Sequence, residues 1–151
     1  KEMGLKIKKL SKSSYEIYCK TLKPIKKIST KEFPGYPTDL QAQLIATQLK
    51  SGLKSKVVEN IFENRFIHIP ELRRFGANLS IKGNTVTIDK TSNLLGAEVM
   101  ATDIRASFSL IIAAMMSKGK TVINRIYHLD RGYEDFDLKL KKCGVNISRK
   151  K

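Results

Sequence analysis

A repeated segment constrains the fold of this chain more than any other feature of its sequence. Three stretches match: Lys1 to Ile7 (KEMGLKI), Leu72 to Ile81 (LRRFGANLSI) and Leu140 to Arg149 (LKKCGVNISR). Each places basic, helix-favouring residues before a glycine and alternating apolar residues after it. Such a glycine suits the left-handed position that ends a helix, and the alternation predicts a strand directly afterwards. A chain that repeats in this way is expected to consist of similar units packed side by side.

A second matched pair of segments predicts where two helices begin. Thr38 starts the segment TDLQA and Thr102 starts TDIRA. Each threonine is placed to act as the N-cap, and Gln41 stands where the reciprocal residue of a capping box would be. The two helices are expected to end near Gly52 and Gly119.

The remaining elements of each unit follow in the same order. The apolar residues from Ile104 to Met116 recur at helical spacing and spread onto the opposite face, which predicts a helix buried nearly all round. Strands are predicted at Lys56–Ile61 and Thr121–Ile126, and second helices at Pro70–Phe75 and Tyr133–Cys143.

Two hairpins complete the pattern. Residues 79–88 alternate about a Gly83-Asn84 turn, and residues 5–19 alternate about a turn of serines. The hairpin at residues 5–19 would end an earlier unit, so the chain is expected to start inside a repeat, with further sequence before Lys1. The predicted organisation is 1–32 as the end of one unit and a connection, 33–95 as a unit, and 96–151 as another. Apolar surface left uncovered at that start predicts marginal solubility or self-association.

Composition narrows the class of protein. The formal charge is +15, and residues 1–31 hold ten lysines against two glutamates, a balance of 10 − 2 = +8. Such a segment can bind the phosphates of nucleic acid, or it can be a solvated face beside a site for anionic substrates. No nucleic-acid recognition motif accompanies the lysines, which favours the solvated face.

Other features exclude several kinds of site. Cys19 and Cys143 lie far apart, with no histidine at metal-ligand spacing, so neither a metal nor a cofactor is expected. No apolar run approaches the ~20 residues that span a bilayer, and no signal peptide is evident, so a cytoplasmic protein is expected. His68 and His128 lack the sequence partners of a triad, which favours structural roles for both.

Four segments carry a resemblance to a known family. PGYPTDLQAQ (34–43), ENIFENRFIHIPELRRFGA (59–77), GAEVMATDIRAS (96–107) and IYHLDRGYEDF (126–136) resemble the enolpyruvyl transferases, in particular those that act on UDP-N-acetylglucosamine. The resemblance implies an α/β fold of the inside-out type, in which three similar units place helices inside and sheets outside. This chain would supply about two and a third units of the C-terminal domain.

The resemblance also implies a reaction and a set of site residues. Enolpyruvyl would pass from phosphoenolpyruvate to the 3-hydroxyl of UDP-N-acetylglucosamine, with release of phosphate, as a step of bacterial peptidoglycan synthesis. Taken alone, Asp39 and Asp103 would be ordinary acids in the first turn of a helix, and the arginines would be surface residues. The match assigns the catalytic roles to Asp39, as base, and Arg131, and substrate contacts to Asp39, Ile61, Arg65, Asp103, Arg105 and Arg131.

Part of the family's site has no counterpart in this chain. The lysine–asparagine pair and the loop with the reactive cysteine are expected before Lys1, and neither Cys19 nor Cys143 stands in the matching context. The chain is therefore expected to need the N-terminal part of the same enzyme and to be inactive alone. Two alternatives stay open: transfer to 3-phosphoshikimate on the same fold, and a catalytically silent basic binding module.

Overall fold

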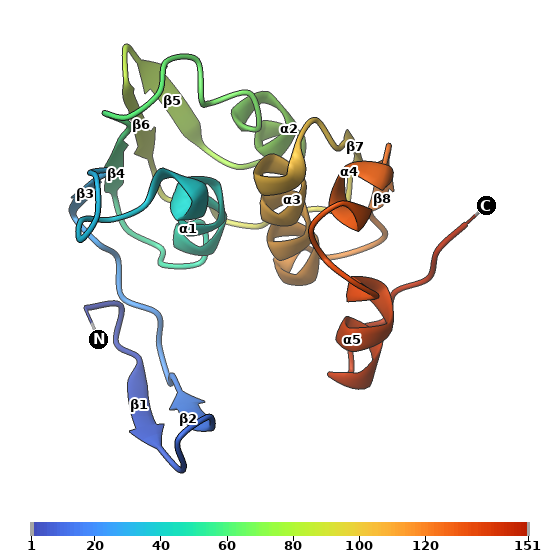
Figure 1. Cartoon of the computed structure of the whole chain (residues 1–151). Helices are drawn as coiled ribbons and strands as arrows, with labels where there is room; N and C mark the ends of the chain where they lie inside the picture. The colour runs from blue at the N-terminus through green and yellow to red at the C-terminus, as the bar shows by residue number, and fades with distance from the viewer. Residues whose placement is uncertain (1, 151) are drawn as a thin grey trace.

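The first hairpin stands apart from the rest of the molecule. The structure is a computed structural model that describes residues 2–150, so Lys1 and Lys151, at the ends of the predicted units, lie outside the described residues. Strands β1 (Lys6–Lys9) and β2 (Tyr15–Tyr18) pair antiparallel, with Ile7 opposite Ile17, as the alternation predicted. All eight strand residues are exposed, and Figure 1 shows the hairpin projecting away from the helices.

The central sheet has four strands in the order β3-β4-β6-β5. Its strands are β3 (Lys27–Ser29), β4 (Ser55–Val58), β5 (Leu79–Lys82) and β6 (Thr85–Ile88). β3 runs parallel to β4, whereas β6 pairs antiparallel with both β4 and β5. The predicted hairpin at 79–88 is confirmed. β3 was not predicted, and it pairs across the proposed boundary at residue 33, so that boundary stays a prediction from the sequence.

A second parallel pair of strands follows later in the chain. β7 (Glu98–Met100) runs parallel to β8 (Val122–Asn124), as β3 does to β4. A helix connects each pair, α1 (Gln41–Gln48) in the first case and α3 (Ile104–Met116) in the second. The short helices that follow are α2 (Ile69–Arg74) after β4, then α4 (Tyr127–Asp130) and α5 (Phe136–Lys142) after β8. The repeat predicted from the sequence is therefore present in the structure.

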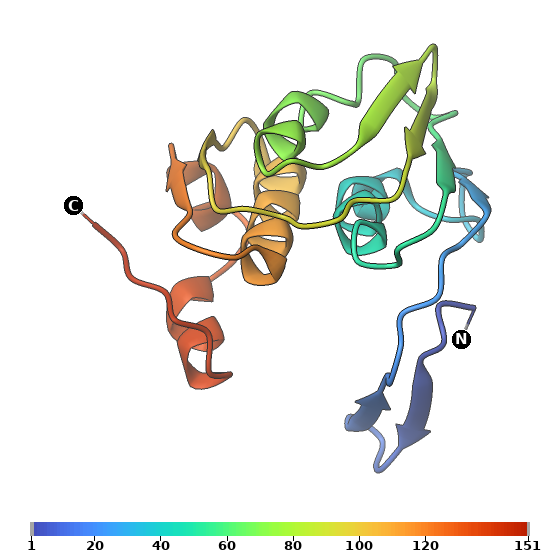
Figure 2. The same ribbon diagram turned by 180° about the vertical axis from the view of Figure 1, so that it is seen from behind.

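Helices α1 and α3 pack against each other in the interior. Figures 1 and 2 show the β3-β4-β6-β5 sheet beside α1, and β7 and β8 on the far side of α3. Ile45 and Ala46 of α1 and Leu110 and Ala113 of α3 are buried in one core cluster. The prediction that α3 is buried nearly all round goes too far: six of its 13 residues are buried, six are partly buried and Met115 is exposed. Helices thus lie inside and sheets outside, as expected.

The repeated glycines end their helices as predicted. Gly76 and Gly144 follow α2 and α5 with φ angles of 84° and 88°, and Gly4 has a φ of 83°. After α5, the Gly144 N–H donates to Lys141 O at 3.0 Å and the Val145 N–H donates to Leu140 O at 3.1 Å. These two bonds satisfy carbonyl groups that the helix leaves without partners.

The predicted caps of α1 and α3 are wrong. Thr38 lies in a 3₁₀ turn, η1 (Thr38–Leu40), and α1 begins after Leu40 with no side-chain cap, so Gln41 completes no capping box. Helix α3 is capped by Asp103, whose carboxylate accepts hydrogen bonds from the backbone N–H groups of residues 105 and 106, and Thr102 precedes that cap. A carboxylate is the stronger acceptor at the positive end of a helix, and the Thr38 hydroxyl is engaged elsewhere, by Glu59.

The predicted helix at 133–143 starts later than expected. Asp135 adopts a left-handed φ of 46°, which interrupts the helical path, and α5 begins only at Phe136. Residues 133–135 lie in turns instead, and the single helical turn α4, which comes earlier in the chain, was not predicted from the sequence pattern. The strands predicted at 56–61 and 121–126 are present but shorter, as β4 at Ser55–Val58 and β8 at Val122–Asn124.

Gly96 allows two backbone segments to approach closely before β7. A Cβ atom at this position would overlap the backbone of Lys120, and the Gly96 N–H donates to Lys118 O at 2.7 Å. We expect Gly96→Ala to lower the free energy of unfolding by roughly 1–3 kcal/mol, because the overlapping atoms are backbone and cannot rotate away. Urea denaturation measures this change. Ser92→Ala, at a nearby exposed position, is the control and should change it by less than about 0.5 kcal/mol.

Candidate active site

Asp39 is the centre of a charged cluster drawn from three parts of the chain. Its Oδ1 accepts hydrogen bonds from Arg65 Nη2 at 2.9 Å and from Arg105 Nη1 at 3.0 Å. Asp39 lies in η1 just before α1, Arg65 lies in the turns between β4 and α2, and Arg105 lies in the first turn of α3. The structure therefore brings together three of the residues that the sequence proposed for substrate binding.

The charges of this cluster face solvent to different degrees. The Asp39 side chain is 67% exposed, whereas that of Arg65 is 18% exposed. The guanidinium of Arg65 lies over the ring of Phe62, with Cζ 4.6 Å from the ring centroid. Contact with an aromatic face orients a guanidinium without neutralising it. Arg65 is thus held by the protein, while the carboxylate that it binds remains open to an approaching ligand.

Asp103 both caps α3 and lies beside the Asp39 cluster. Its Oδ1 accepts from the N–H groups of Arg105 and Ala106 at 2.8 and 3.0 Å, and it lies 3.8 Å from Arg105 Nε. The Arg105 guanidinium is therefore flanked by two carboxylates, Asp39 and Asp103. The cap sets the start of α3, and the same oxygen helps to orient the first arginine of that helix.

Ile61 is connected to the same region through its backbone. Its N–H donates to Glu59 Oε1 at 2.9 Å, and Thr38, next to Asp39, donates to Glu59 Oε2 at 2.8 Å. Because Glu59 already accepts from this N–H, the backbone group of Ile61 that remains for a ligand is its carbonyl. Glu59 was not among the predicted site residues. A lone acidic residue directly after the apolar pair Val57-Val58 is the signal that could have identified it.

The backbone of Arg131 lies near the Asp39 cluster, but its side chain makes no contact with that cluster. It follows α4 as the C-cap and is exposed, and among residues 2–150 it forms no ion pair. Gly132 packs against α3: a Cβ atom there would lie 3.2 Å from Ile104 Cγ2, beside Arg105. The structure thus places Arg131 at the start of α3, with its side chain unattached to the other proposed site residues.

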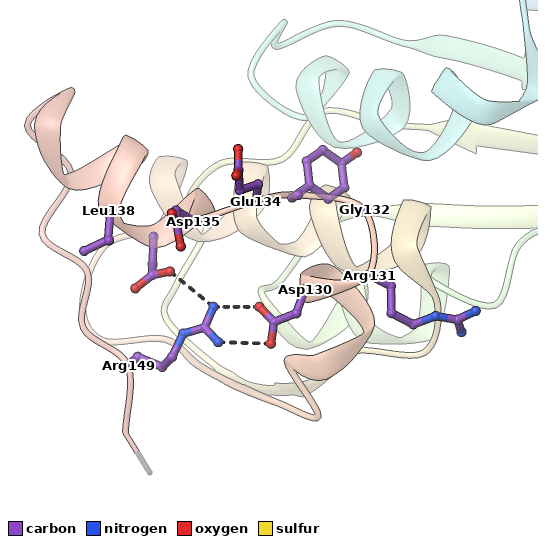
Figure 3. Close-up of a pocket in the computed structure, with 9 residues that line it drawn as sticks. Asp130, Arg131, Gly132, Glu134, Asp135, Leu138 and Arg149 are labelled. Carbon is purple, nitrogen blue, oxygen red and sulfur yellow. Dashed lines mark hydrogen bonds and ion pairs between the residues drawn. The ribbon is translucent and has the colours of Figure 1, made fainter.

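A hollow of about 780 Å³ opens on the outer side of α4 and α5 (Figure 3). Arg149 crosses it, donating to both carboxylate oxygens of Asp130 at 3.0 and 2.7 Å and to Asp137 at 3.2 Å. The hydrogen bond from Arg149 lowers the pKa of Asp130. Arg131 points away from this ion pair in Figure 3. The lining is residues 130–135, 137, 138 and 149, so the hollow is separate from the Asp39 cluster.

The two histidines differ in their surroundings. His68 caps α2, is 1% exposed, and has no hydrogen-bond partner at Nε2. Burial lowers its pKa to about 4, while the negative charge of Asp103 acts in the opposite direction. His128 is half-buried, lies against Tyr127 with ring centroids 4.3 Å apart, and also lacks a partner at Nε2. Neither contacts the Asp39 carboxylate in the part of the chain that is described.

The buried His68 should make stability depend on pH. Its folded pKa of about 4 lies below the ordinary 6.5, so between these values the unfolded chain binds a proton that the folded chain excludes. Stability is therefore complete above pH 6.5 and should fall by up to about 3 kcal/mol as pH drops toward 4. Urea denaturation from pH 7 to 4 measures this loss.

Substitution of each histidine in turn isolates the contribution of His68 to the pH dependence of stability. His68→Phe should make the unfolding free energy depend less steeply on pH in that range, because it removes the imidazole whose pKa burial lowers. His128→Phe is the matched control and should leave the slope as in the parent chain. Equal slopes in all three proteins would contradict the assignment to His68.

Comparison with known proteins places this geometry in a family. The family model described as EPSP synthase (3-phosphoshikimate 1-carboxyvinyltransferase) matches residues 1–140 of the chain. The chain belongs to this family. The enolpyruvyl transferase resemblance drawn from the four sequence motifs is thereby confirmed.

Relatives within this family carry a more specific name. Proteins named UDP-N-acetylglucosamine 1-carboxyvinyltransferase are 57% identical in Rhodopseudomonas palustris over 81% of the chain, 53% in Pelagibacter ubique over 93%, and 50% in Helicobacter hepaticus over 99%. The matched segments are 28%, 34% and 35% of those proteins. The chain spans about a third of the length of these relatives.

Solved structures of the family share the fold. The enolpyruvyl transferase NikO from Streptomyces tendae matches 97% of the chain and 34% of its own, with a TM-score of 0.84 and 26% identity. EPSP synthase from Acinetobacter baumannii matches 99% and 35%, with a TM-score of 0.70 and 14% identity, which supports the fold alone. The predicted α/β fold class is confirmed by these similarities.

Two further features are absent from residues 2–150. No helix in that range is both long and apolar enough to cross a membrane. Over the same residues, no three histidine, cysteine or acidic side chains gather in a group that could hold a metal ion.

Proposed function

We propose that the chain is part of a UDP-N-acetylglucosamine 1-carboxyvinyltransferase, which transfers enolpyruvyl from phosphoenolpyruvate to the sugar 3-hydroxyl and releases phosphate. The observation that carries the proposal is the Asp39 carboxylate bound by Arg65 and Arg105. The names of relatives at 50–57% identity support the choice of acceptor. The enzyme would act in the bacterial cytoplasm, in peptidoglycan synthesis.

Asp39 and its two arginines provide groups that this reaction requires. The acceptor hydroxyl must lose a proton, and the donor carries a phosphate and a carboxylate that need cations. Guanidinium groups bind both anions in two-pronged fashion. An anionic substrate at Arg65 and Arg105 would compete for the guanidinium groups that now bind Asp39. The carboxylate, released in this way, would then accept the proton of the sugar hydroxyl.

The remaining proposed residues surround this centre. Arg131, which follows α4 beside the start of α3, would close on phosphoenolpyruvate and act with Asp39 in catalysis. The carbonyl of Ile61 would contact the UDP-sugar. Asp103 would hold Arg105 toward the substrate through the oxygen that caps α3. The proton donor for the enol carbon would come from the remaining part of the enzyme, and no cofactor takes part in the proposed reaction.

Two alternatives are supported by single observations. The description of the matching family model names 3-phosphoshikimate as acceptor, whereas the relatives above are named for the UDP-sugar. A basic binding module would rest on the exposed lysines of β1. The strand register places Lys6 and Lys8 on one face and Lys9 on the other, so these charges do not form a single stripe.

An enzyme assay with a chimera tests the function. The chain would replace the matching third of the Pelagibacter ubique relative, and phosphate release from phosphoenolpyruvate would be measured with each acceptor. We expect release with UDP-N-acetylglucosamine, none with 3-phosphoshikimate, and none from the chain alone. Release only with 3-phosphoshikimate would favour the first alternative. Salt-sensitive binding of the chain to nucleic acid, with no turnover by the chimera, would favour the second.

Asp39→Asn in the same chimera tests the catalytic centre. The substitution keeps the size of the side chain but removes the base, so we expect kcat to fall by about 10²- to 10⁴-fold. The matched control is Asp89→Asn, which makes the same change at an aspartate that pairs with Lys54 at 3.1 Å. This control should leave kcat within about twofold. An Asp39→Asn enzyme as active as the control would refute the assignment of Asp39 as base.

A further inference from the structure

Glu59 is a buried carboxylate that accepts hydrogen bonds from four neutral donors. It directly follows β4 and is 3% exposed. Oε1 accepts from Thr30 Oγ1 at 2.8 Å, Ile61 N at 2.9 Å and Phe62 N at 3.2 Å. Oε2 accepts from Thr38 Oγ1 at 2.8 Å. A buried charge is tolerated when donors fill its lone pairs, so these four hydrogen bonds offset the cost of burying the Glu59 carboxylate.

The electrostatics of Glu59 agree with this arrangement. Burial by itself raises the pKa of Glu59. The hydrogen bonds from Ile61 N–H, the Thr38 and Thr30 hydroxyls and Phe62 N–H outweigh burial and leave the pKa below its ordinary value. These donors therefore stabilise the charged form.

Two of these donors belong to opposite sides of the Asp39–Arg65 ion pair. Thr38 immediately precedes Asp39, so its hydrogen bond anchors the turn that carries the proposed base. Phe62 lies under the Arg65 guanidinium, so its hydrogen bond anchors the ring that orients that arginine. Glu59, Thr38, Asp39, Arg65 and Phe62 thus form a closed circuit of contacts. A shift of either turn would separate the carboxylate from the guanidinium.

Hydrogen bonds to the four-stranded sheet hold the backbone around Glu59 in place. Thr30 continues β3, its N–H donates to Val58 O, and its hydroxyl accepts from Asn60 N at 2.8 Å. The Glu59 N–H donates to Asn84 O at 2.8 Å, and the Asn84 side chain donates to that of Asn60 at 3.0 Å. These contacts connect Glu59 to β3 and to the β5-β6 turn, which belong to one four-stranded sheet. The carboxylate can therefore act as a fixed point.

We propose that Glu59 is a positioning residue for the acceptor side of the active site, acting through the Thr38 hydroxyl on Asp39 and through the backbone on Ile61. The inference rests on the proposed function, since Asp39 and Ile61 are its residues for the UDP-sugar. Glu59 itself contacts no substrate in this assignment. Arg65 is connected to Glu59 through Phe62 and not through Thr38, and Arg105 and Arg131 lie on other elements, so loss of the Thr38 hydrogen bond should affect the donor side of the site much less.

Thr38→Val and Thr38→Ser in the chimera form a matched pair. Valine keeps the shape of threonine without the hydroxyl, whereas serine keeps the hydroxyl. We expect Thr38→Val to lower kcat/KM for UDP-N-acetylglucosamine by about 10- to 100-fold through loss of alignment, with KM for phosphoenolpyruvate within about twofold. Thr38→Ser should stay within about threefold of the parent. Equal losses in both variants, or a parallel rise in KM for both substrates, would overturn the proposal in favour of a general structural role.

Two measurements on the chain separate this proposal from the proposed function. The carboxyl carbon resonance of Asp39 should shift in Thr38→Val and not in Thr38→Ser. Amide exchange of Ile61 and Phe62 should accelerate in Glu59→Gln, while exchange in β5 and β6 stays as in the parent. An unchanged Asp39 resonance would overturn the positioning role whichever acceptor the chimera uses. Absence of turnover with UDP-N-acetylglucosamine, together with the expected shifts, would refute only the proposed function.

Discussion

The packing of α1 against α3 is the interaction on which the rest of the structure depends. Each helix connects two parallel strands, so burying both helices in one interior places the two sheets outside. Small, buried residues such as Ala46 and Ala113 belong to this core and allow the helices to approach closely. The same packing brings the start of α3 to the turn before α1. Arg105 reaches Asp39 for that reason, across 66 positions of sequence.

The carboxylates of Asp39 and Glu59 have opposite environments. The Asp39 side chain is 67% exposed, and ion pairs at such positions contribute about 0–1 kcal/mol to stability. Its contacts with Arg65 and Arg105 are therefore weak enough to exchange with an anionic substrate. Glu59 is buried and accepts from four donors, so removing one donor leaves a desolvated charge, which costs more. The exposed carboxylate suits chemistry, and the buried one suits alignment.

Much of the fold could be predicted because its signals are local. The left-handed glycines Gly76 and Gly144, the 79–88 hairpin and the apolar helix 104–116 each follow from neighbouring residues. The strands β3 and β7 could not be predicted in this way. Each has three residues and becomes a strand only by pairing in parallel with a segment some 25 residues later. A pattern of period two needs a longer run to be recognised.

The sequence by itself determined the fold class, the repeats and the candidate site residues that the family motifs carry. Tertiary structure alone decided how these residues are used. Thr38 and Thr102 stand in the same local pattern, yet the Thr38 hydroxyl donates to Glu59 and Asp103, not Thr102, caps α3. Both outcomes depend on acceptors and amides that folding brings into reach. Hydrogen bonds act over about 3 Å, so a pattern of residue types can propose partners, and only the packed chain selects among them.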